Sequence, residues 1–246
     1  MNDIFPKVGQ DAVPHLTTDQ MIEVDRAMIQ DFGIELIQMM ENAGRGLARL
    51  AMSRFLPQSA TSKKVLVLAG RGGNGGGALV AARRLHHWGA TVEVALTRPA
   101  DSFDGIPKHQ LAIVKKLNIP IHEQTLSFAV PHLIVDGMIG YSLKGAPREH
   151  TADLIQFVNA ADTPVLSLDT PSGIDTTSGT VYDPAVAATA TLTLALPKAG
   201  LLAVNTSPLV GELYLADISV PPTLYSSLGL TVSPQLFAAS DIIRLT

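Results

Sequence analysis

The strongest constraint on the fold is the alternation of apolar, strand-like runs with helical or polar segments from Lys64 onward. Runs rich in Val, Leu and Ile are typical of strands buried on both faces, as in a parallel sheet covered by helices. The runs are VLVLAG (65–70), TVEVAL (91–96), HLIVDGMIG (132–140), PVLSLD (164–169), ATLTLAL (190–196) and GELYLADI (211–218). Helices are expected between them, ending near Trp88 and lying around 107–117 and 150–160. The pattern predicts an α/β fold, a three-layer αβα Rossmann-like sandwich with a mostly parallel central sheet.

Two helices are predicted before the first of these strands. Thr17 precedes Gln20 by three residues, which is the spacing of a capping box and marks the start of the first helix. The second helix is expected over 34–55, where apolar residues recur along roughly one stripe and the methionines are expected to fill the core. Residues 1–15 show no periodicity and are interpreted as a flexible or strapped-on arm. The segment after Pro221 is expected to pack across the sheet edge.

The composition narrows the class of protein. The 246 residues carry 18 Lys and Arg against 22 Asp and Glu, a formal net charge of -4, with no basic cluster that follows a phosphate backbone, so nucleic acid is not expected as a ligand. The absence of Cys excludes disulfides and thiolate metal sites. Because neither an export signal nor an apolar run of membrane-spanning length is visible, the prediction is a cytoplasmic protein with no membrane contact.

A glycine-rich stretch, AGRGGNGGGALVAARRL (69–85), joins the first of these strands to a helix. Gly70, Gly72 and Gly75 have the G-x-G-x-x-G spacing, which lets backbone N–H groups approach a phosphate; a tight turn with no ligand is the equal alternative. A dinucleotide site also needs an acidic residue at the end of the next strand, but Thr97 and Arg98 stand there. The sequence therefore argues against a conventional NAD-binding site, although Arg98 is suited to bind the 2′-phosphate of NADP.

Two more strand ends carry polar residues. Asp136 ends one strand and is followed by a glycine-rich loop, and Asp169 ends the next, just before Ser172. Since the carboxyl ends of parallel strands share one edge, these loops and the glycine stretch are expected to form one ligand-binding rim.

At this point the chain resembles the NAD(P)H-hydrate epimerases, the YjeF N-terminal domain family. The matching motifs occur in the family's order: MMENAG (39–44), the glycine loop, the Asp136 and Asp169 segments, PKAGL (197–201) and GELYLADISVP (211–221). The resemblance covers roughly 16–222 and implies a single domain of this type over 1–246, with no dehydratase domain. It implies an isomerase that interconverts the R and S forms of hydrated NADH or NADPH for a separate dehydratase. A homodimer and a bound potassium ion are further implications.

The resemblance also assigns residues. Asp169 is predicted to be the proton-transfer group, with Lys144 as its cationic partner, since enclosing a carboxylate with a lysine tunes it toward neutral pH. Potassium ligands are expected at Asn74, Asp136 and Ser172. Substrate contacts are expected at Gly73, Asn74, Gly75, Gly76, Gly77, Gly140, Tyr141, Ser142, Leu143, Lys144, Gly145, Ala146 and Asp169.

Simpler interpretations remain open at these positions. Asp169 is suited to capping the following turn, and Lys144 to a solvated loop. For Lys198 a functional role is left open beside the simpler interpretation, a loop lysine near a strand end. The seven histidines show no metal-ligand spacing.

The chain departs from the family pattern in the glycine loop. Where relatives have GNNGGDG, residues 72–78 place glycine at the first Asn and, as Gly77, at the Asp. Loss of two polar side chains favours the alternative of an impaired or inactive nucleotide-binding or scaffold protein, a role known for some relatives of this fold. A dehydrogenase and a serine hydrolase are disfavoured, because the acidic ribose ligand and a G-x-S-x-G elbow are both missing.

Overall fold

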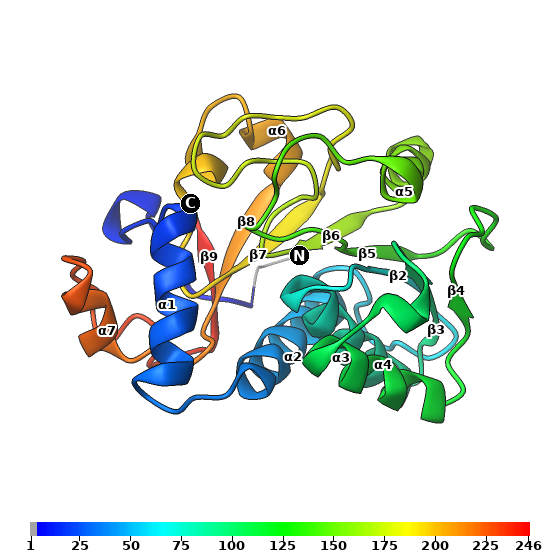
Figure 1. The fold of residues 1–246 in the computed structure, drawn as a ribbon, viewed down its shortest axis with the longest axis horizontal. Helices are drawn as coiled ribbons and strands as arrows, with labels where there is room; N and C mark the ends of the chain where they lie inside the picture. The colour runs from blue at the N-terminus through cyan, green and yellow to red at the C-terminus, as the bar shows by residue number, and fades with distance from the viewer. Residues whose placement is uncertain (1–3) are drawn as a thin grey trace.

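The computed structural model describes residues 4–246, and within them nine strands form one sheet in the order β1-β9-β8-β7-β6-β5-β2-β3-β4 (Figure 1). Neighbouring strands are parallel except β8 and β9, which are antiparallel. The strands are β1 (Lys7–Val8), β2 (Lys64–Ala69), β3 (Thr91–Leu96), β4 (Ile121–His122), β5 (Leu133–Gly137), β6 (Val165–Leu168), β7 (Ala190–Leu194), β8 (Glu212–Ala216) and β9 (Ile242–Leu245). The six longer strands predicted from apolar runs are all present, and the predicted mostly parallel sheet is confirmed.

Helices cover both faces of the sheet. They are α1 (Thr18–Gln30), α2 (Leu36–Arg54), α3 (Gly73–His87), α4 (Gly105–Lys116), α5 (Glu149–Ala160), α6 (Ser207–Val210) and α7 (Pro222–Ser227), with short 3-10 turns at Gln10–Ala12, Ala100–Ser102 and Ala199–Leu202. Because side chains alternate along a strand, Val65 and Val67 belong to the core beneath α2 and α3, while Leu66 joins the core beneath α5. The two cores confirm the three-layer αβα arrangement (Figure 1). No helix within residues 4–246 is long and apolar enough to cross a membrane.

Helix α1 begins as the sequence predicts. Thr17 accepts a hydrogen bond from the Gln20 backbone N–H, and the Gln20 side chain accepts one from the Thr17 N–H. Just before this cap, Leu16 forms an isolated parallel β-bridge with Lys198. The Leu16 N–H donates to the Pro197 carbonyl, and the Leu16 carbonyl accepts from the Ala199 N–H. The start of α1 is therefore fixed to the segment that follows β7.

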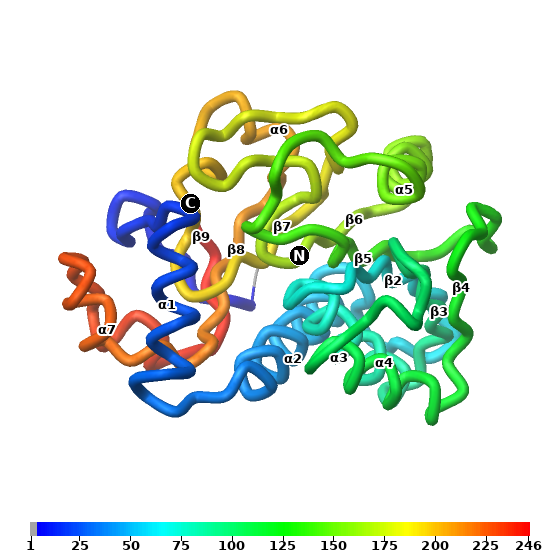
Figure 2. The backbone as a smooth tube through the Cα atoms, in the orientation of Figure 1, coloured from blue at the N-terminus to red at the C-terminus, as the bar shows by residue number. Residues whose placement is uncertain are grey.

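The two chain ends form the edge of the sheet. β1 pairs in parallel with β9, and β9 pairs with β8 (Figure 2). Of the two interpretations of residues 1–15, a flexible or a strapped-on arm, the second is confirmed for Lys7–Val8, which are hydrogen-bonded in the sheet, while residues 1–3 lie outside the described chain. The expected packing of the last segment across the sheet edge is confirmed by β9. Both strands are too short to show periodicity, which explains why the sequence does not reveal them.

The strand order places a topological switch point at β2. The chain leaves β2 for β3 and β4 on one side and returns to β5 on the other. In open parallel sheets a crevice forms at the carboxyl ends of the strands where the direction of winding reverses, and ligands bind there. The loops after β2 and β5, which include the glycine stretch and the residues following Asp136, lie at this crevice.

Candidate active site

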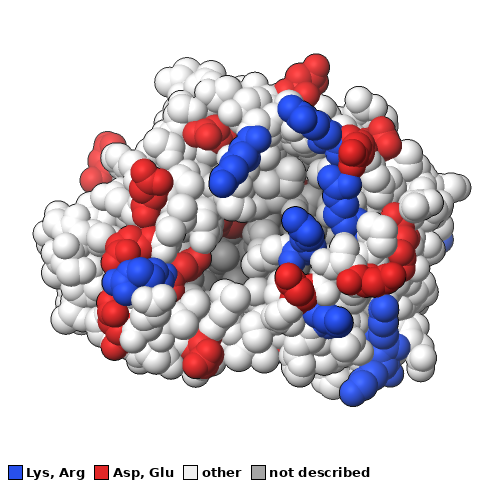
Figure 3. Space-filling model, in the orientation of Figure 1, with Lys and Arg blue, Asp and Glu red and all other residues white. Residues whose placement is uncertain are grey.

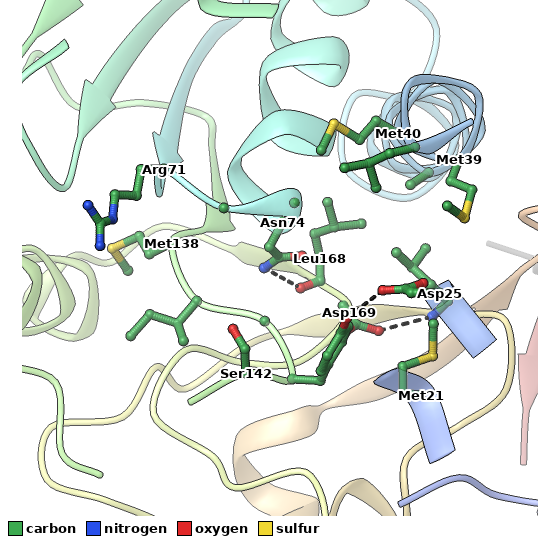
Figure 4. A pocket seen from close by; sticks show the side chains of 18 of the residues that line it. Met21, Asp25, Met39, Met40, Arg71, Asn74, Met138, Ser142, Leu168 and Asp169 are labelled. Atoms are coloured by element: carbon green, nitrogen blue, oxygen red, sulfur yellow. Dashed lines mark hydrogen bonds between the residues drawn. The ribbon is translucent and has the colours of Figure 1, made fainter. Parts of the chain in front are cut away.

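A cavity of about 370 Å³ lies at the switch point, within the size range of small-molecule pockets. Its walls come from α1, α2, the β2–α3 turn, the ends of β3 and β6, and the loop after β5. The space-filling view shows a central hollow on the face that carries these loops (Figure 3). Four methionines, Met21, Met39, Met40 and Met138, give the cavity an apolar surface (Figure 4). Met39 and Met40, expected only as core filler, therefore also line the site.

Asp169 and Lys198 form a buried ion pair at the cavity. Lys198 is fully buried, and its Nζ donates to Asp169 Oδ1 and, at 2.8 Å, to the Leu194 carbonyl. The same Oδ1 accepts a 3.3 Å bond from the Leu194 N–H, so Oδ2 is the oxygen without a hydrogen bond in the described chain. Asp169 lines the cavity and has a φ of 64°, a left-handed conformation that Asp adopts more readily than most residues. Backbone held this way clusters at functional sites.

The lysine beside Asp169 is not the predicted one. Lys144 is exposed in the loop after β5 and does not line the cavity. Its predicted pairing with Asp169 is therefore wrong, because the loop directs it to solvent while the turn after β7 places Lys198 beneath the carboxylate. Lys198 does lie in the segment after β7, as expected for a loop lysine near a strand end, but it is fully buried against Asp169, which favours the functional interpretation.

Asp136 is fully buried and held by neutral donors. Its oxygens accept from the Ser172 hydroxyl at 2.6 Å, the Ser172 N–H at 2.9 Å, the Ser167 hydroxyl at 2.9 Å and the Met138 N–H at 3.1 Å. Burial raises the pKa of Asp136, and these hydrogen bonds oppose that rise. Asp136 and Ser172 thus form one hydrogen-bonded unit directly below the loop that carries Ile139, whose N–H donates to Ser172 Oγ at 2.9 Å.

Asn74 lies against the loop after β5, where a Cβ on Gly140 would stand 3.2 Å from Asn74 Cβ. Its amide donates to the Leu168 carbonyl at 3.0 Å (Figure 4), and its Oδ1 accepts no hydrogen bond from the described chain. Asn74 lines the cavity, whereas Asp136 and Ser172 do not.

The glycine stretch is mostly helix rather than loop, because α3 starts at Gly73. Gly73 and Asn74 line the cavity, but Gly75, Gly76 and Gly77 are buried behind its wall. A Cβ on Gly75 would lie 1.7 Å from the Gly70 carbonyl oxygen, and one on Gly76 would lie 2.5 Å from Met40 Sδ. These glycines therefore permit close packing of the turn and of α2. Whether any of them contacts a substrate stays a prediction.

Gly77 is buried next to the cavity wall and does not itself line the cavity. An added Cβ would lie 2.8 Å from Leu168 Cδ2 and 3.7 Å from Ala43 Cβ, and both of these residues line the cavity. The glycine therefore allows this part of the wall to pack closely in this chain.

The loop after β5 is only partly in the site. Gly140, Tyr141 and Ser142 line the cavity, and Leu143, Lys144, Gly145 and Ala146 do not. The prediction that residues 140–146 bind the substrate thus has structural support for its first three positions.

Tyr141 contacts a residue that the sequence analysis did not single out. Its hydroxyl donates to Oδ2 of Asp25 on α1, and Asp25 also lines the cavity (Figure 4). Burial is the largest cause of the raised pKa of Asp25, and nearby Asp169 raises it further. Burial, followed by the charge of Asp25, likewise raises the pKa of Tyr141. One signal was available in the sequence: Asp25 follows Met21 by four residues and precedes Met28 by three, so it lies on the apolar face of its helix.

Two arginines line the cavity away from these acids. Arg98 at the end of β3 pairs with Glu149, while Arg71 in the β2–α3 turn makes no side-chain ion pair with the described residues. The absence of an acidic residue beside Thr97 agrees with the argument against a conventional NAD site.

Comparison with known proteins identifies the family. Residues 36–200 match the family described as YjeF-related protein N-terminus, and the chain belongs to this family. The crystal structure of the yeast protein YNL200c superimposes with a TM-score of 0.78 at 22% identity, covering 95% of this chain and 100% of that one, which supports the fold.

Relatives in bacteria and archaea are similar along most of the chain. The NAD(P)H-hydrate epimerase of Dehalogenimonas lykanthroporepellens is 40% identical, with 98% of this chain and 97% of that protein covered. The NAD(P)H-hydrate epimerase of Truepera radiovictrix is 39% identical, with 84% and 91% covered. The bifunctional NAD(P)H-hydrate repair enzyme of Pyrobaculum aerophilum is 35% identical over 93% of this chain, which spans only 46% of that enzyme.

Proposed function

We propose that the chain is an isomerase that interconverts the R and S forms of hydrated NADH and NADPH. The 40% identity to a named epimerase over nearly the full length of both chains supports this function. The structural observation that carries it is the Asp169–Lys198 pair, buried at the switch-point cavity with one carboxylate oxygen left open. The same kind of relative disfavours the scaffold alternative, which rested on the two polar side chains that the glycine loop lacks.

The reaction needs a proton acceptor and a proton donor at the carbon that bears the hydroxyl. Asp169 is suited to accept a proton, because it lines the cavity and its Oδ2 accepts no hydrogen bond from the described residues, while Lys198 holds Oδ1. The methionine-lined wall offers an apolar surface to the nicotinamide ring. Arg71 and Arg98 supply positive charge for the phosphates of the nucleotide.

The oxygen-rich donor set beside the cavity fits a monovalent cation. Within the described residues Asn74 Oδ1 accepts no hydrogen bond and the buried Asp136 accepts only from neutral donors, so a cation would balance the charge of the Asp136 carboxylate. We propose that potassium is held by Asn74, Asp136 and Ser172. When bound, it would supply positive charge close to the substrate phosphates. A homodimer, a separate dehydratase as pathway partner and a cytoplasmic location stay predictions from the sequence.

The test is the epimerisation of one purified epimer of NADPH hydrate, followed by chromatography with and without potassium. We expect acceleration by the parent chain and a loss of about 10²–10⁴-fold in Asp169→Asn, the range for removal of a proton-transfer group. Asp153→Asn, an exposed aspartate on α5, is the matched control and should keep parent activity. A folded parent chain that fails to exceed the spontaneous rate would exclude the proposed function.

A further inference from the structure

The cavity contains a second carboxyl group, from Asp25 on α1, in addition to Asp169. Asp25 lies between Met21 and Met28 on the inward face of the helix, where a carboxylate has no structural partner on its own element. Polar groups placed on a buried helix face cost free energy unless something compensates. The cost of placing a carboxyl group on this face of α1 is therefore evidence for a functional role of Asp25.

The contacts of Asp25 fix it toward the cavity. The Tyr141 hydroxyl donates a hydrogen bond to Asp25 Oδ2, so a side chain from the loop after β5 holds the carboxyl group in place. The helix itself is fixed by the Leu16 bridge to the segment that contains Lys198. Because Lys198 also holds Asp169, the segment that contains Lys198 contacts both the start of the helix that carries Asp25 and the second carboxyl group.

The two carboxyl groups come from different walls and have different surroundings. Asp169 stands at the end of β6 with a lysine against it, whereas Asp25 stands on the covering helix with a neutral phenol against it. The charged or titratable groups that face Asp25 are Tyr141, Asp169 and Lys198. Burial raises the pKa of Asp25 most and the charge of Asp169 adds to the rise, whereas the Tyr141 hydrogen bond and the charge of Lys198 oppose it; the net rise favours the protonated form of Asp25. A protonated carboxyl group and a lysine-paired carboxylate in one cavity are suited to act as an acid and a base.

We propose that Asp25 is the second catalytic residue of the epimerase, a general acid that works with Asp169 and is positioned by Tyr141. The assignment rests on the function proposed above.

In one direction Asp25 gives its proton to the substrate hydroxyl, and the C–O bond breaks as water leaves. The lone pair of the ring nitrogen forms a C=N bond. A water molecule then attacks the opposite face of that carbon, its electron pair forms the new C–O bond, and its proton passes to Asp169. The reverse direction starts with the proton on Asp169.

This assignment explains why α1 closes the cavity. A site that used Asp169 alone would need the same group to serve both faces of the ring. A carboxyl group on a separate wall allows each face its own proton-transfer group. One turnover moves one proton from Asp25 to Asp169, and proton exchange with solvent restores the starting form before the next turnover in the same direction.

The test compares Asp25→Asn and Tyr141→Phe with the parent chain in the epimerisation assay. Asp19→Asn, on the exposed face of the same helix, is the matched control. We expect Asp25→Asn to lower kcat about 10²–10⁴-fold with little change in KM, and Tyr141→Phe to give a smaller loss. Circular dichroism and binding of NADPH to each variant report whether the cavity is still folded.

The pH profile separates catalysis from a structural role. For the parent chain kcat/KM should fall as pH rises through the raised pKa of Asp25, because the acid loses its proton, and Asp25→Asn should lack that decline. In water enriched in oxygen-18, the written step places one solvent oxygen on the product in each turnover. An active parent with a fully active Asp25→Asn variant, an unchanged pH profile, or product that keeps its oxygen would overturn the assignment while leaving the epimerase intact. An inactive parent would instead overturn the function itself.

Discussion

At the scale of single residues, the Asp169–Lys198 pair is the feature with the largest expected energetic effect. The lysine is fully buried and the aspartate only 3% exposed, so each charge depends mainly on its partner for compensation. Removing one member of such a pair leaves an uncompensated buried charge, which is strongly destabilising.

We therefore expect Lys198→Met to lower the free energy of unfolding by about 3–5 kcal/mol. Combining it with Asp169→Asn should recover part of that loss, because a neutral amide then replaces the carboxylate that Lys198→Met leaves unpaired. Urea denaturation of the parent, both single variants and the double variant measures the coupling. Lys116→Met, at an exposed position on α4, is the control, and a Lys198 effect no larger than that control would contradict a buried pair.

The site residues differ in how far the sequence reveals them. Asp169 is recognisable because it directly follows a strand-like run. Lys198 is not, because its pairing depends on how the turn after β7 folds back under a strand end 29 residues away. Asp25 is recognisable in the sequence as a charged residue within an apolar helix stripe. Only the fold shows that this stripe faces a cavity.

At the scale of elements, the β2–α3 turn shows why the run of glycines is needed. Gly75 is pressed against the backbone of Gly70, and Gly44 on α2 is pressed against Val80 on α3, where an added Cβ would lie 2.4 Å from Val80 Cβ. The sequence predicted the turn and the helix that follows it. It did not distinguish glycines that pack from glycines that face a ligand, because both need bare backbone.

Gly75→Ala should destabilise the protein, and Gly73→Ala should not. At Gly75 the new methyl group would lie 1.7 Å from a carbonyl oxygen that has little freedom to move, so we expect a loss of about 1–3 kcal/mol or more. At Gly73 the nearest atom is Met40 Cε at 3.8 Å, an ordinary contact, and alanine is the better helix former. Guanidinium denaturation of the two variants checks the contrast, and equal midpoints would show that the turn adapts.

At the scale of the whole molecule, the order of the strands creates the site. The apolar runs predict how many long strands exist and that they are parallel, since their residues are buried on both faces. They do not predict that β5 returns to the opposite side of β2, because strand order depends on contacts between distant segments. That return places the glycine turn, Asp169 and the loop after β5 around one crevice.

Strands from the two chain ends, β1 and β9, form one edge of the sheet. The stability of this edge therefore depends on contacts that span nearly the whole sequence. Ile242 of β9 is fully buried, and its Cδ1 lies 3.9 Å from where a Cβ on Gly46 of α2 would stand. The last strand thus supports the helix that carries Met39 and Met40 to the cavity.

Ile242→Ala should lower the free energy of unfolding by about 2–5 kcal/mol, the range for truncating a buried Ile to Ala. Val130→Ala, at a side chain 80% exposed, is the control and should change stability by less than about 0.5 kcal/mol. Chemical denaturation measures both, and amide hydrogen exchange in α2 locates the effect. Faster exchange in α2 of the Ile242 variant would show that the chain end supports the cavity wall, whereas unchanged exchange would confine the role of β9 to the sheet edge.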